Sequence, residues 1–408
     1  MRSALHAKGK IQPGAAVRVL LINDYGGPYA GAETLTLGLR AALRERGHEA
    51  RLLASGARLL PGENLADYRC AGTTSRLQPL FEAWNPSAAR AVRRAIAEFR
   101  PDVAHVSMFL WQLSPSILRH LRDLPAVYHV MTYKPVCPTG TKVLPDGGPC
   151  RHAPGRVCRS GGCQAWPSWL ARAAQQRMWR GWQGAFDRIV PISESVAIRL
   201  REAGIAAEPP VSPGVPVREP RPPLSDPPLV AFAGRLAREK GVDTLLGAMP
   251  AVLARVPDAR LLVAGDGPDG SRLRALAARL GIEDRTRFLG HLAARELDAA
   301  LSPAWVQAVP SLWHEPFGLV APEAMMRGTA VVGTVAGGLQ ETVVDGETGL
   351  LVPIGDSDAL AAALVRVLSS RETAEAMGAA GRRRAIDRFG ESAFVDAFLE
   401  IYREMLAA

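Results

Sequence analysis

Trp313-His-Glu-Pro-Phe-Gly-Leu-Val-Ala-Pro-Glu-Ala-Met-Met-Arg-Gly328 is the most informative stretch of the chain. It carries two carboxylates, Glu315 and Glu323, with seven residues between them. The turn between them predicts a helix whose first N–H groups and dipole attract negative charge. A phosphate cradle flanked by two hydroxyl acceptors suits a sugar nucleotide. An ordinary capped core helix is the alternative, and the stretch alone does not separate the two.

The totals indicate a globular chain of two domains. The sequence has 408 residues, 48% of them hydrophobic, and no apolar run reaches the roughly 18 residues that span a bilayer. Residues 1–14 are polar and basic without the apolar centre of a signal peptide, so we expect a disordered lead and a cytoplasmic protein. The net charge of +9 comes without a nucleic-acid-binding motif, so we expect no nucleic acid. An anionic substrate, or a peripheral contact with an anionic membrane, is consistent with this positive net charge.

The first half begins like a nucleotide-binding unit. Residues 17–23 predict a buried strand, a glycine-rich loop follows up to Gly31, and a helix opens at Ala32-Glu33-Thr34. Gly31 would let this loop approach a phosphate or an acceptor, although close backbone packing explains the glycines equally well. Further strands are expected at 51–54, 101–106, 126–131 and 188–193, and Ser193 would cap the next helix.

A proline-rich stretch at 217–228 divides the chain, because so much proline suits neither a helix nor a central strand. A second α/β pattern follows, with strands expected at 229–233, 260–264, 286–290, 304–309, 330–333 and 349–352. We therefore expect two Rossmann-like parallel-sheet domains facing a cleft. The predicted boundaries are 15–216, with a cysteine-rich loop at 134–165, then 229–390. A closing helix at 391–408 would pack back on the first domain.

Cations in the second half complement the opening stretch. Arg235 and Lys240 follow the strand at 229–233, and the carboxyl edge of a parallel sheet is where ligands bind. Release of a diphosphate leaves about two to three negative charges to be neutralised. Arginine and lysine can do this without a metal ion, so we expect no cofactor for catalysis. A lone pair of such residues would be ordinary surface charge, but the combination predicts a donor site.

Four of the five cysteines, Cys137, Cys150, Cys158 and Cys163, fall in one loop. Clustered thiols in a reducing compartment favour a structural zinc ion over disulfides. The loop has no Cys-x-x-Cys pair, which is the stronger zinc signature, so free thiols and redox-labile bridges remain alternatives. The fifth, Cys70, is expected to be a buried apolar residue.

Two further features have competing interpretations. His129 shares a strand face with Met131, so it could reach a substrate, or it could be a hydrogen-bonded core histidine. Residues 166–188 carry several tryptophans and arginines on a helical pattern. Such a helix can lie on anionic lipid, but an ordinary helix that covers the sheet is the preferred interpretation.

Three motifs together resemble a known family. Gly234-Arg-Leu with Glu239-Lys-Gly, Gly265-Asp-Gly-Pro, and Glu315-x7-Glu323 are similar to those of the retaining glycosyltransferases of family 4, which have the GT-B fold. The resemblance covers nearly the whole chain, including Gly31-Ala-Glu33. Members with this cysteine loop commonly carry His-Asp where this chain has Met131-Thr132, and His129 would compensate.

The resemblance implies roles for individual residues. Arg235 and Lys240 would hold the diphosphate, Glu315 would contact the transferred sugar, and Glu323 would bind the ribose. Backbone groups complete the donor site, and His129 joins Glu315, Arg235 and Lys240 in the catalytic set. These backbone and base-side positions are Gly31, Gly234, Gly265, Leu289, Phe317, Gly318, Leu319 and Val320.

The implied reaction moves a sugar from a UDP- or GDP-sugar to an unidentified acceptor with retention of the anomeric configuration and without metal. The leaving phosphate would assist deprotonation of the acceptor. Polysaccharide, glycolipid or glycosylated-metabolite biosynthesis would use such an enzyme. A sugar-nucleotide epimerase and a non-catalytic sugar-nucleotide-binding protein are the competing hypotheses.

Overall fold

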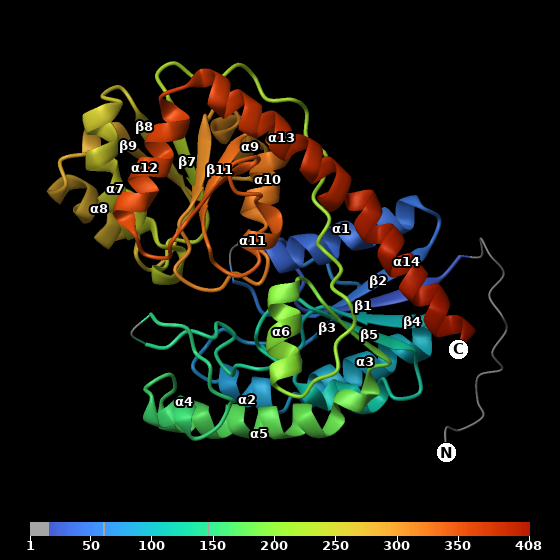
Figure 1. Cartoon of the computed structure of the whole chain (residues 1–408). Coiled ribbons are helices and arrows are strands. Elements are labelled where there is room, and N and C mark those ends of the chain that lie inside the picture. The colour runs from blue at the N-terminus through green and yellow to red at the C-terminus, as the bar shows by residue number, and fades with distance from the viewer. Residues whose placement is uncertain (1–15, 60–61, 146) are drawn as a thin grey trace. The chain divides into compact units, whose positions relative to one another are not determined.

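The structure is a computed structural model that describes residues 16–59, 62–145 and 147–408 (Figure 1). The lead expected at residues 1–14 lies outside this described part. Within it, no helix combines the length and the apolar character that crossing a bilayer needs. The described residues form two parallel six-stranded sheets with helices, so the prediction of an α/β fold is confirmed.

The first sheet has the strand order β3-β2-β1-β4-β5-β6, and every pairing in it is parallel. Its strands are β1 (Arg18–Tyr25), β2 (Glu49–Ser55), β3 (Tyr68–Cys70), β4 (Val103–Val106), β5 (Ala126–Val130) and β6 (Arg188–Pro191). The helices of this half are α1 (Gly31–Glu45), α2 (Gln78–Ala83), α3 (Pro86–Phe99), η1 (Pro115–His120), α4 (Val157–Ser160), α5 (Trp166–Trp182), η2 (Gln183–Ala185) and α6 (Glu194–Glu202).

The second sheet repeats this topology with the order β12-β11-β10-β7-β8-β9, again all parallel. Its strands are β7 (Leu229–Ala233), β8 (Arg260–Ala264), β9 (Thr286–Gly290), β10 (Val306–Val309), β11 (Ala330–Thr334) and β12 (Gly349–Val352). The helices are η3 (Arg238–Lys240), α7 (Val242–Arg255), α8 (Gly270–Arg279), η4 (Glu283–Arg285), α9 (Ala294–Leu301), α10 (Val320–Arg327), α11 (Leu339–Thr342), α12 (Ser357–Leu368), α13 (Arg371–Phe389) and α14 (Glu391–Ala407).

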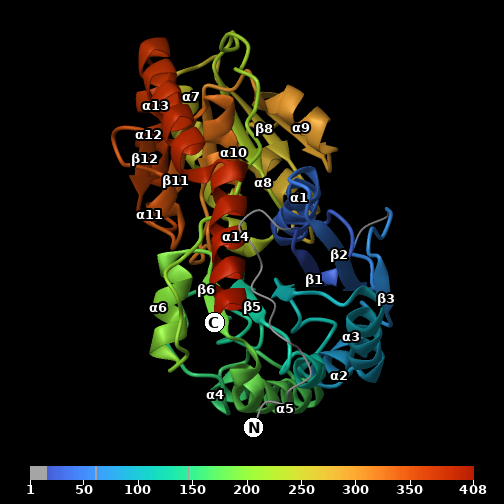
Figure 2. The same ribbon diagram turned by 90° about the vertical axis from the view of Figure 1, so that its right-hand side faces the viewer.

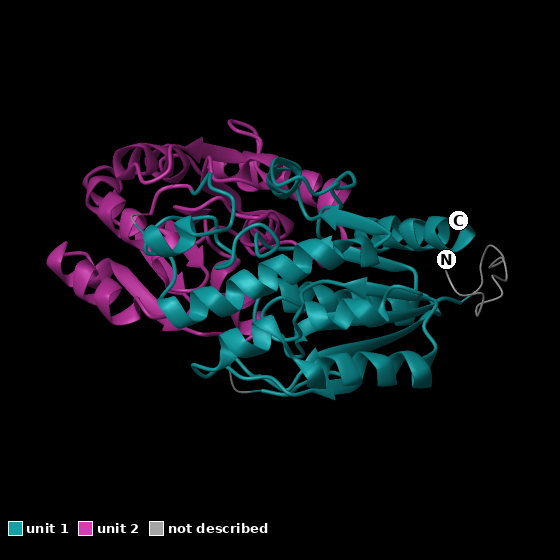
Figure 3. Cartoon of the chain, turned by 90° about the horizontal axis from the view of Figure 1, so that it is seen from below, with its two compact units in different colours: residues 1–146, 150–213, 392–408 teal, residues 147–149, 214–391 magenta. Residues whose placement is uncertain are grey.

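The chain forms two compact units, coloured separately in Figure 3. Unit 1 comprises residues 1–146, 150–213 and 392–408, and unit 2 comprises residues 147–149 and 214–391. Most of α14 therefore belongs to unit 1, where Phe394 and Phe398 pack on histidines of β4 and β5.

The apolar runs became buried strands for the expected reason. All five residues of β7, β11 and β5 are buried, as in a parallel sheet covered on both faces. Strands β7, β8, β9 and β12 have the predicted bounds. The three-residue strand β3 was not predicted, because so short an edge strand has too few residues to show a period.

Candidate functional site

The carboxyl edge of the second sheet contains a topological switch point. From β7 the sheet grows in one direction through β8 and β9, and in the opposite direction through β10, β11 and β12. The strand order therefore reverses between β7 and β10. Loops leaving two such neighbouring strands diverge, and the crevice between them is where open α/β sheets bind ligands. Arg235 and Lys240 follow β7, and Ser311 and Glu315 follow β10. The predicted donor residues thus come from the two loops at this switch point.

Lys240 and Glu315 form the centre of the site. The Lys240 Nζ lies 2.7 Å from Glu315 Oε1, and Ser311 Oγ donates to the same oxygen at 2.6 Å. Glu315 is 4% exposed, while the Lys240 side chain is 26% exposed. Trp313 adds a face for the ammonium group, 5.3 Å from its ring centre. A carboxylate fixed in this way by a cation and a hydroxyl still has an oxygen that can accept from a ligand.

Close backbone contacts hold the two loops together. Leu312 N–H donates to Glu239 O at 2.9 Å. Gly241, which follows Lys240, has φ +67°, and a Cβ there would lie 1.9 Å from Pro310 O. A side chain at Gly241 would therefore push the two loops apart. Gly265 is equally constrained, since its Cβ would lie 1.9 Å from Gly234 O.

Arg235 lies at the open side of the site. Its side chain is 65% exposed and pairs with Glu239, whose own side chain is 21% exposed. A charge this exposed is free to reorient toward an anion at little cost. Glu239 and Ser311 were not predicted as site residues. The only signal for them in the sequence is spacing: Glu239 follows Arg235 by four residues, and Ser311 precedes Glu315 by four.

Helix α10 begins at Val320, after the turn that follows Glu315, as predicted. Gly338 N–H donates to Glu315 O at 2.9 Å, and Gly318 has φ +83°, which turns the chain into the helix. Within the first turn of α10, Ala321 N–H donates to Gly318 O at 2.9 Å and Pro322 has no N–H, so an anion would meet the N–H groups at Phe317–Val320, where the turn enters the helix. Phe317 is buried, whereas Leu319 and Val320 are half-buried.

Glu323 lies in the first turn of α10 and is half-buried. Burial raises the pKa of its carboxyl, and Arg327 and Arg218 oppose that rise. Arg327 donates to Asp298 at 3.1 Å and to Gln307 at 2.6 Å. These bonds hold the guanidinium in place beside Glu323.

The remaining candidates are divided between the units. Leu289 lies on β9 of unit 2 and is half-buried. Gly31 is the exposed first residue of α1 and belongs to unit 1, as does His129.

His129 is a core residue, which corrects the expectation that it can reach a substrate. It is fully buried, with its ring 4.8 Å from Phe398 and 5.7 Å from His105 between centres. No hydrogen bond of normal geometry joins either ring nitrogen to a described residue, although the backbone of Val211 lies close enough to oppose the fall in the pKa of the ring. Burial lowers the pKa of His129 to about 3, so the ring is neutral at physiological pH. Phe394 and Phe398 of α14 cover the ring, and this contact between distant parts of the chain leaves no local signal in the sequence.

The four cysteines of the loop lie near enough to influence one another's pKa. Cys137 is buried and the other three thiols of the loop are half-exposed, all of them unpaired. Across the described residues, no three His, Cys, Asp or Glu side chains lie together as metal ligands. Burial raises the pKa of Cys158 and of Cys163, and the neighbouring thiols add to the rise. Structural zinc stays a prediction from sequence alone.

A buried charge cluster anchors this loop. Lys134 Nζ lies 2.7 Å from Glu82 and donates to Pro138 O at 2.8 Å, while Arg172 donates to Glu82 at 2.9 Å. Glu82 is fully buried and Lys134 is 1% exposed. Burial lowers the pKa of Lys134 to about 8, although Glu82 opposes this change. The cluster was not predicted, because its members are far apart in sequence.

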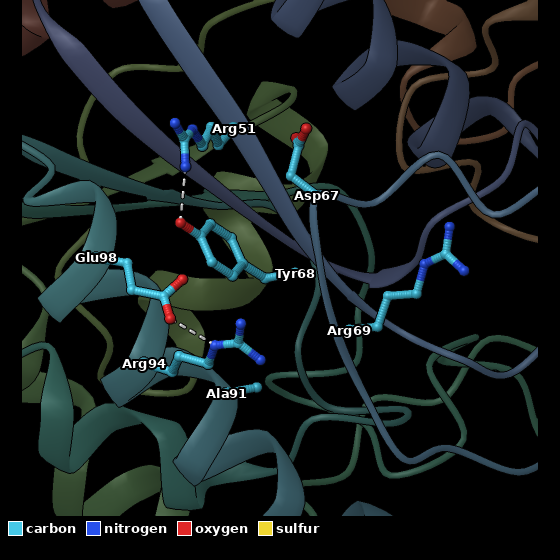
Figure 4. A pocket seen from close by; sticks show the side chains of 7 residues that line it. All are labelled: Arg51, Asp67, Tyr68, Arg69, Ala91, Arg94 and Glu98. Carbon is cyan, nitrogen blue, oxygen red and sulfur yellow. Dashed lines mark hydrogen bonds and ion pairs between the residues drawn. The ribbon is translucent and has the colours of Figure 1, made fainter.

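Two other features do not add to the site. A pocket of about 380 Å³ in unit 1 is lined mainly by residues of β2, β3 and α3, and its charged side chains already make hydrogen bonds within unit 1 (Figure 4). Arg51 donates to Tyr68 at 2.9 Å, and Arg94 donates to Glu98 at 2.7 Å. The second feature is the Asp-x-Asp sequence at residues 356–358, whose paired carboxylates are a type of ligand that Mg²⁺ accepts. It lies at the N-terminus of α12. Asp356 there accepts from Ala359 N–H at 2.9 Å, which is a helix-capping role.

Comparison with known families covers most of the chain. The model of the glycosyl transferases group 1 matches residues 217–384, which lie in unit 2. The model of the glycosyl transferase 4-like domain matches residues 30–214. The two models meet close to the boundary between the units.

Individual proteins agree with these models. D-inositol 3-phosphate glycosyltransferase of Saccharomonospora viridis is 40% identical over 246 residues, which are 54% of this chain and 56% of that protein. The chain thus spans about half the length of this curated relative. Sucrose-phosphate synthase from Thermosynechococcus elongatus has the same fold, with a TM-score of 0.73 at 24% identity over 96% of this chain and 100% of that one.

A third protein with the same fold was solved with UDP-glucose bound. HepE of Anabaena in complex with UDP-glucose gives a TM-score of 0.67 at 19% identity, covering 95% of this chain and 100% of that one. Likeness at this identity concerns the fold alone. The two family models, the repeated sheet topology and the shared fold together lead to one assignment. This chain belongs to the glycosyltransferases with the GT-B fold.

Proposed function

We propose that the protein is a retaining, metal-independent glycosyltransferase that moves a sugar from a UDP- or GDP-sugar to an acceptor. Its product would belong to polysaccharide, glycolipid or glycosylated-metabolite biosynthesis. The observation that carries the proposal is the Lys240–Glu315 pair, 2.7 Å apart, at the switch point of the second sheet. The UDP-glucose bound to HepE supports a nucleotide-sugar donor on this fold.

The donor would be held by charge and by hydroxyl acceptors. Arg235 and Lys240 contact the diphosphate, where two cations stabilise the charge that grows as the sugar leaves. Glu315 accepts from hydroxyls of the transferred sugar, and Glu323 accepts from the ribose. The N–H groups of the turn that leads into α10, at Phe317–Val320, add to the positive field.

The reaction would proceed on one face of the sugar. The bond from the anomeric carbon to the diphosphate oxygen breaks, and the acceptor oxygen bonds to the same face of that carbon. A phosphate oxygen takes the acceptor proton, so the nucleoside diphosphate leaves carrying it. Binding Lys240 to the phosphate would change its contact with Glu315 and free a carboxylate oxygen for the sugar.

A labelled-donor assay tests this function. The full chain is incubated with UDP-, GDP- and ADP-sugars and simple acceptors, in the presence of EDTA, and products are followed by NMR. Nucleotide release with an unchanged anomeric configuration is the expected result. Interconversion of the sugar on an intact nucleotide would show an epimerase, and binding without turnover would show a binding protein. Transfer with inversion would contradict the retaining mechanism.

We also propose that the enzyme works in the reducing cytoplasm. All five of its cysteines are unpaired, as expected where thiols stay reduced. Alkylation of the protein in freshly lysed cells should modify thiols without prior reduction. A requirement for reductant would contradict this location.

A further inference from the structure

Two helices of unit 1, α2 and α5, expose large apolar side chains on their outer faces. The helices pack against each other, and they lie side by side with α4 in both Figure 1 and Figure 2. The exposed side chains follow one another at helical spacing along each helix. They are Leu77 (58% exposed), Leu80 (60%) and Trp84 (43%) at α2, and Trp166 (51%) and Leu170 (48%) on α5.

On α5 the usual amphipathic order holds at Trp179, which is fully buried against Phe109 and Tyr128, but it is reversed at other positions. Its inner face buries Gln175 and Gln176, whose amide groups bond to backbone carbonyls inside unit 1. Gln175 Nε2 donates to Glu82 O at 2.7 Å and to Leu110 O at 2.6 Å. Meanwhile Trp166 and Leu170 face outward. A helix in water normally buries its apolar residues and exposes its polar ones.

The short helix α2 shows the same reversal. Its carboxylate Glu82 is fully buried between Lys134 and Arg172, while both leucines and the tryptophan at this helix are exposed. Single exposed apolar residues need no explanation. Five large ones on two packed helices, both of which bury polar side chains while these stay exposed, indicate a surface that meets an apolar environment.

The charges around these side chains are positive. Residues 150–186 contain six arginines and no aspartate or glutamate. Arg159 lies 4.4 Å above the Trp166 ring, and Arg119 lies 5.0 Å above the Trp84 ring. Arg177 and Arg180 are exposed on α5. We call these four arginines and the five exposed apolar residues the Trp–Arg face.

We propose that the Trp–Arg face docks unit 1 on an anionic lipid bilayer. Tryptophan and leucine would enter the boundary between headgroups and acyl chains, and the arginines would pair with lipid phosphates. Charge complementarity selects anionic lipid over a neutral partner. The proposal does not depend on the donor site, because every residue of the face belongs to unit 1 and none is a donor residue.

Vesicle cosedimentation of the full chain tests the proposal. Vesicles of phosphatidylcholine are compared with vesicles that contain about 30% phosphatidylglycerol. We expect binding to the anionic vesicles at physiological salt and at least about tenfold weaker binding to the neutral ones. Binding should weaken in about 1 M salt, where the screening length falls to about 3 Å. Equal binding to both vesicle types, or no binding to either, would overturn the proposal.

Two sets of variants separate the apolar and the charged contributions. Leu80→Gln with Leu170→Gln keeps all charges, and Arg177→Gln with Arg180→Gln keeps all apolar groups. Each pair should lower the affinity for anionic vesicles by about tenfold. The matched control is Ile386→Gln with Arg366→Gln, two exposed residues of unit 2, which should bind vesicles like the parent chain. An equal loss in the control would contradict the assignment to this face.

The remaining alternative is that a second copy of the chain covers the face. Sedimentation velocity of the full chain without lipid should show a species whose mass does not change on Leu80→Gln with Leu170→Gln. A dimer that this pair dissociates, together with no vesicle binding, would overturn the lipid assignment. Thermal unfolding of each variant shows that it is folded, and unchanged donor binding shows that unit 2 is intact.

Discussion

Lys240 and Glu315 show how far single residues could be predicted from sequence. Their types and their positions after apolar strands predicted that they would lie at one edge of a sheet, and the structure brings them to 2.7 Å. Ser311, which donates to the same carboxylate, was missed, because a serine after a strand has many uses.

Lys240→Ala tests the cation at the centre of the site. Removing one charge that stabilises a leaving group should lower kcat/KM for the donor by about 10² to 10³. Thermal unfolding should change little, since Ser311 still bonds to Glu315. Steady-state kinetics measures the effect, with Arg366→Ala as the control. Retention of full kcat/KM in Lys240→Ala would remove this residue from the donor site.

His129→Ala tests the correction that the fold imposes. The ring fills a space between Phe398 and His105, so its loss should leave a cavity and cost about 2–4 kcal/mol in the free energy of unfolding. Turnover per folded molecule should remain close to that of the parent chain. Urea denaturation and nucleotide-release assays measure the two quantities. A large loss of turnover with unchanged stability would restore the catalytic role.

At the level of elements, the glycines that join the β7 and β10 loops can be tested with a matched pair. Gly241 has φ +67° and Gly281 has φ +65°, but only Gly241 meets the neighbouring backbone. Alanine at Gly281 should cost about 1–2 kcal/mol of stability, the cost of a left-handed residue. Alanine at Gly241 should cost more and should also weaken donor binding, because Lys240 would move. Calorimetry of unfolding and of donor binding measures both, and equal effects at the two positions would contradict this role.

The first turn of α1 predicts a pH dependence of stability. Glu33 is 3% exposed, and burial raises its pKa from 4.5 to about 7, with the charge of Asp24 adding to the rise. Between these pH values the folded chain keeps a proton that the unfolded chain loses, so stability falls as pH rises through this range. Glu33→Gln should therefore gain about 2 to 3 kcal/mol over the parent chain at pH 8 and nothing at pH 4. Denaturation at both values checks this, and a constant difference would refute it.

Elements were more predictable where the residues are uniformly apolar. Strands β7, β8, β9 and β12 were predicted to the residue, because short apolar runs bounded by turns identify buried parallel strands. A closing helix on the first domain was predicted, but neither its particular contacts with β4 and β5 nor the charge cluster around Glu82 was. The α14 contacts and the Glu82 cluster both join residues that are distant in sequence, and local sequence patterns do not predict such contacts.

For the molecule as a whole, the two sheets share one topology but differ in what occupies the switch point. In unit 1 the switch point lies between β1 and β4, and there the Asp24 carboxylate accepts from Trp111, Gln112 and Leu113 N–H groups. In unit 2 the same position holds Lys240 and Glu315, with Arg235 largely exposed. This difference is the reason for placing the proposed donor site in unit 2.

Donor binding to the full chain without divalent metal is the central claim, and calorimetric titration with UDP- and GDP-sugars in EDTA measures it most directly. The parent chain and Arg366→Ala should bind one of these donors with equal affinity, and Arg235→Ala should bind at least about tenfold more weakly. Binding that disappears in EDTA and returns with magnesium, or Arg235→Ala that binds like the parent chain, would contradict the proposed site.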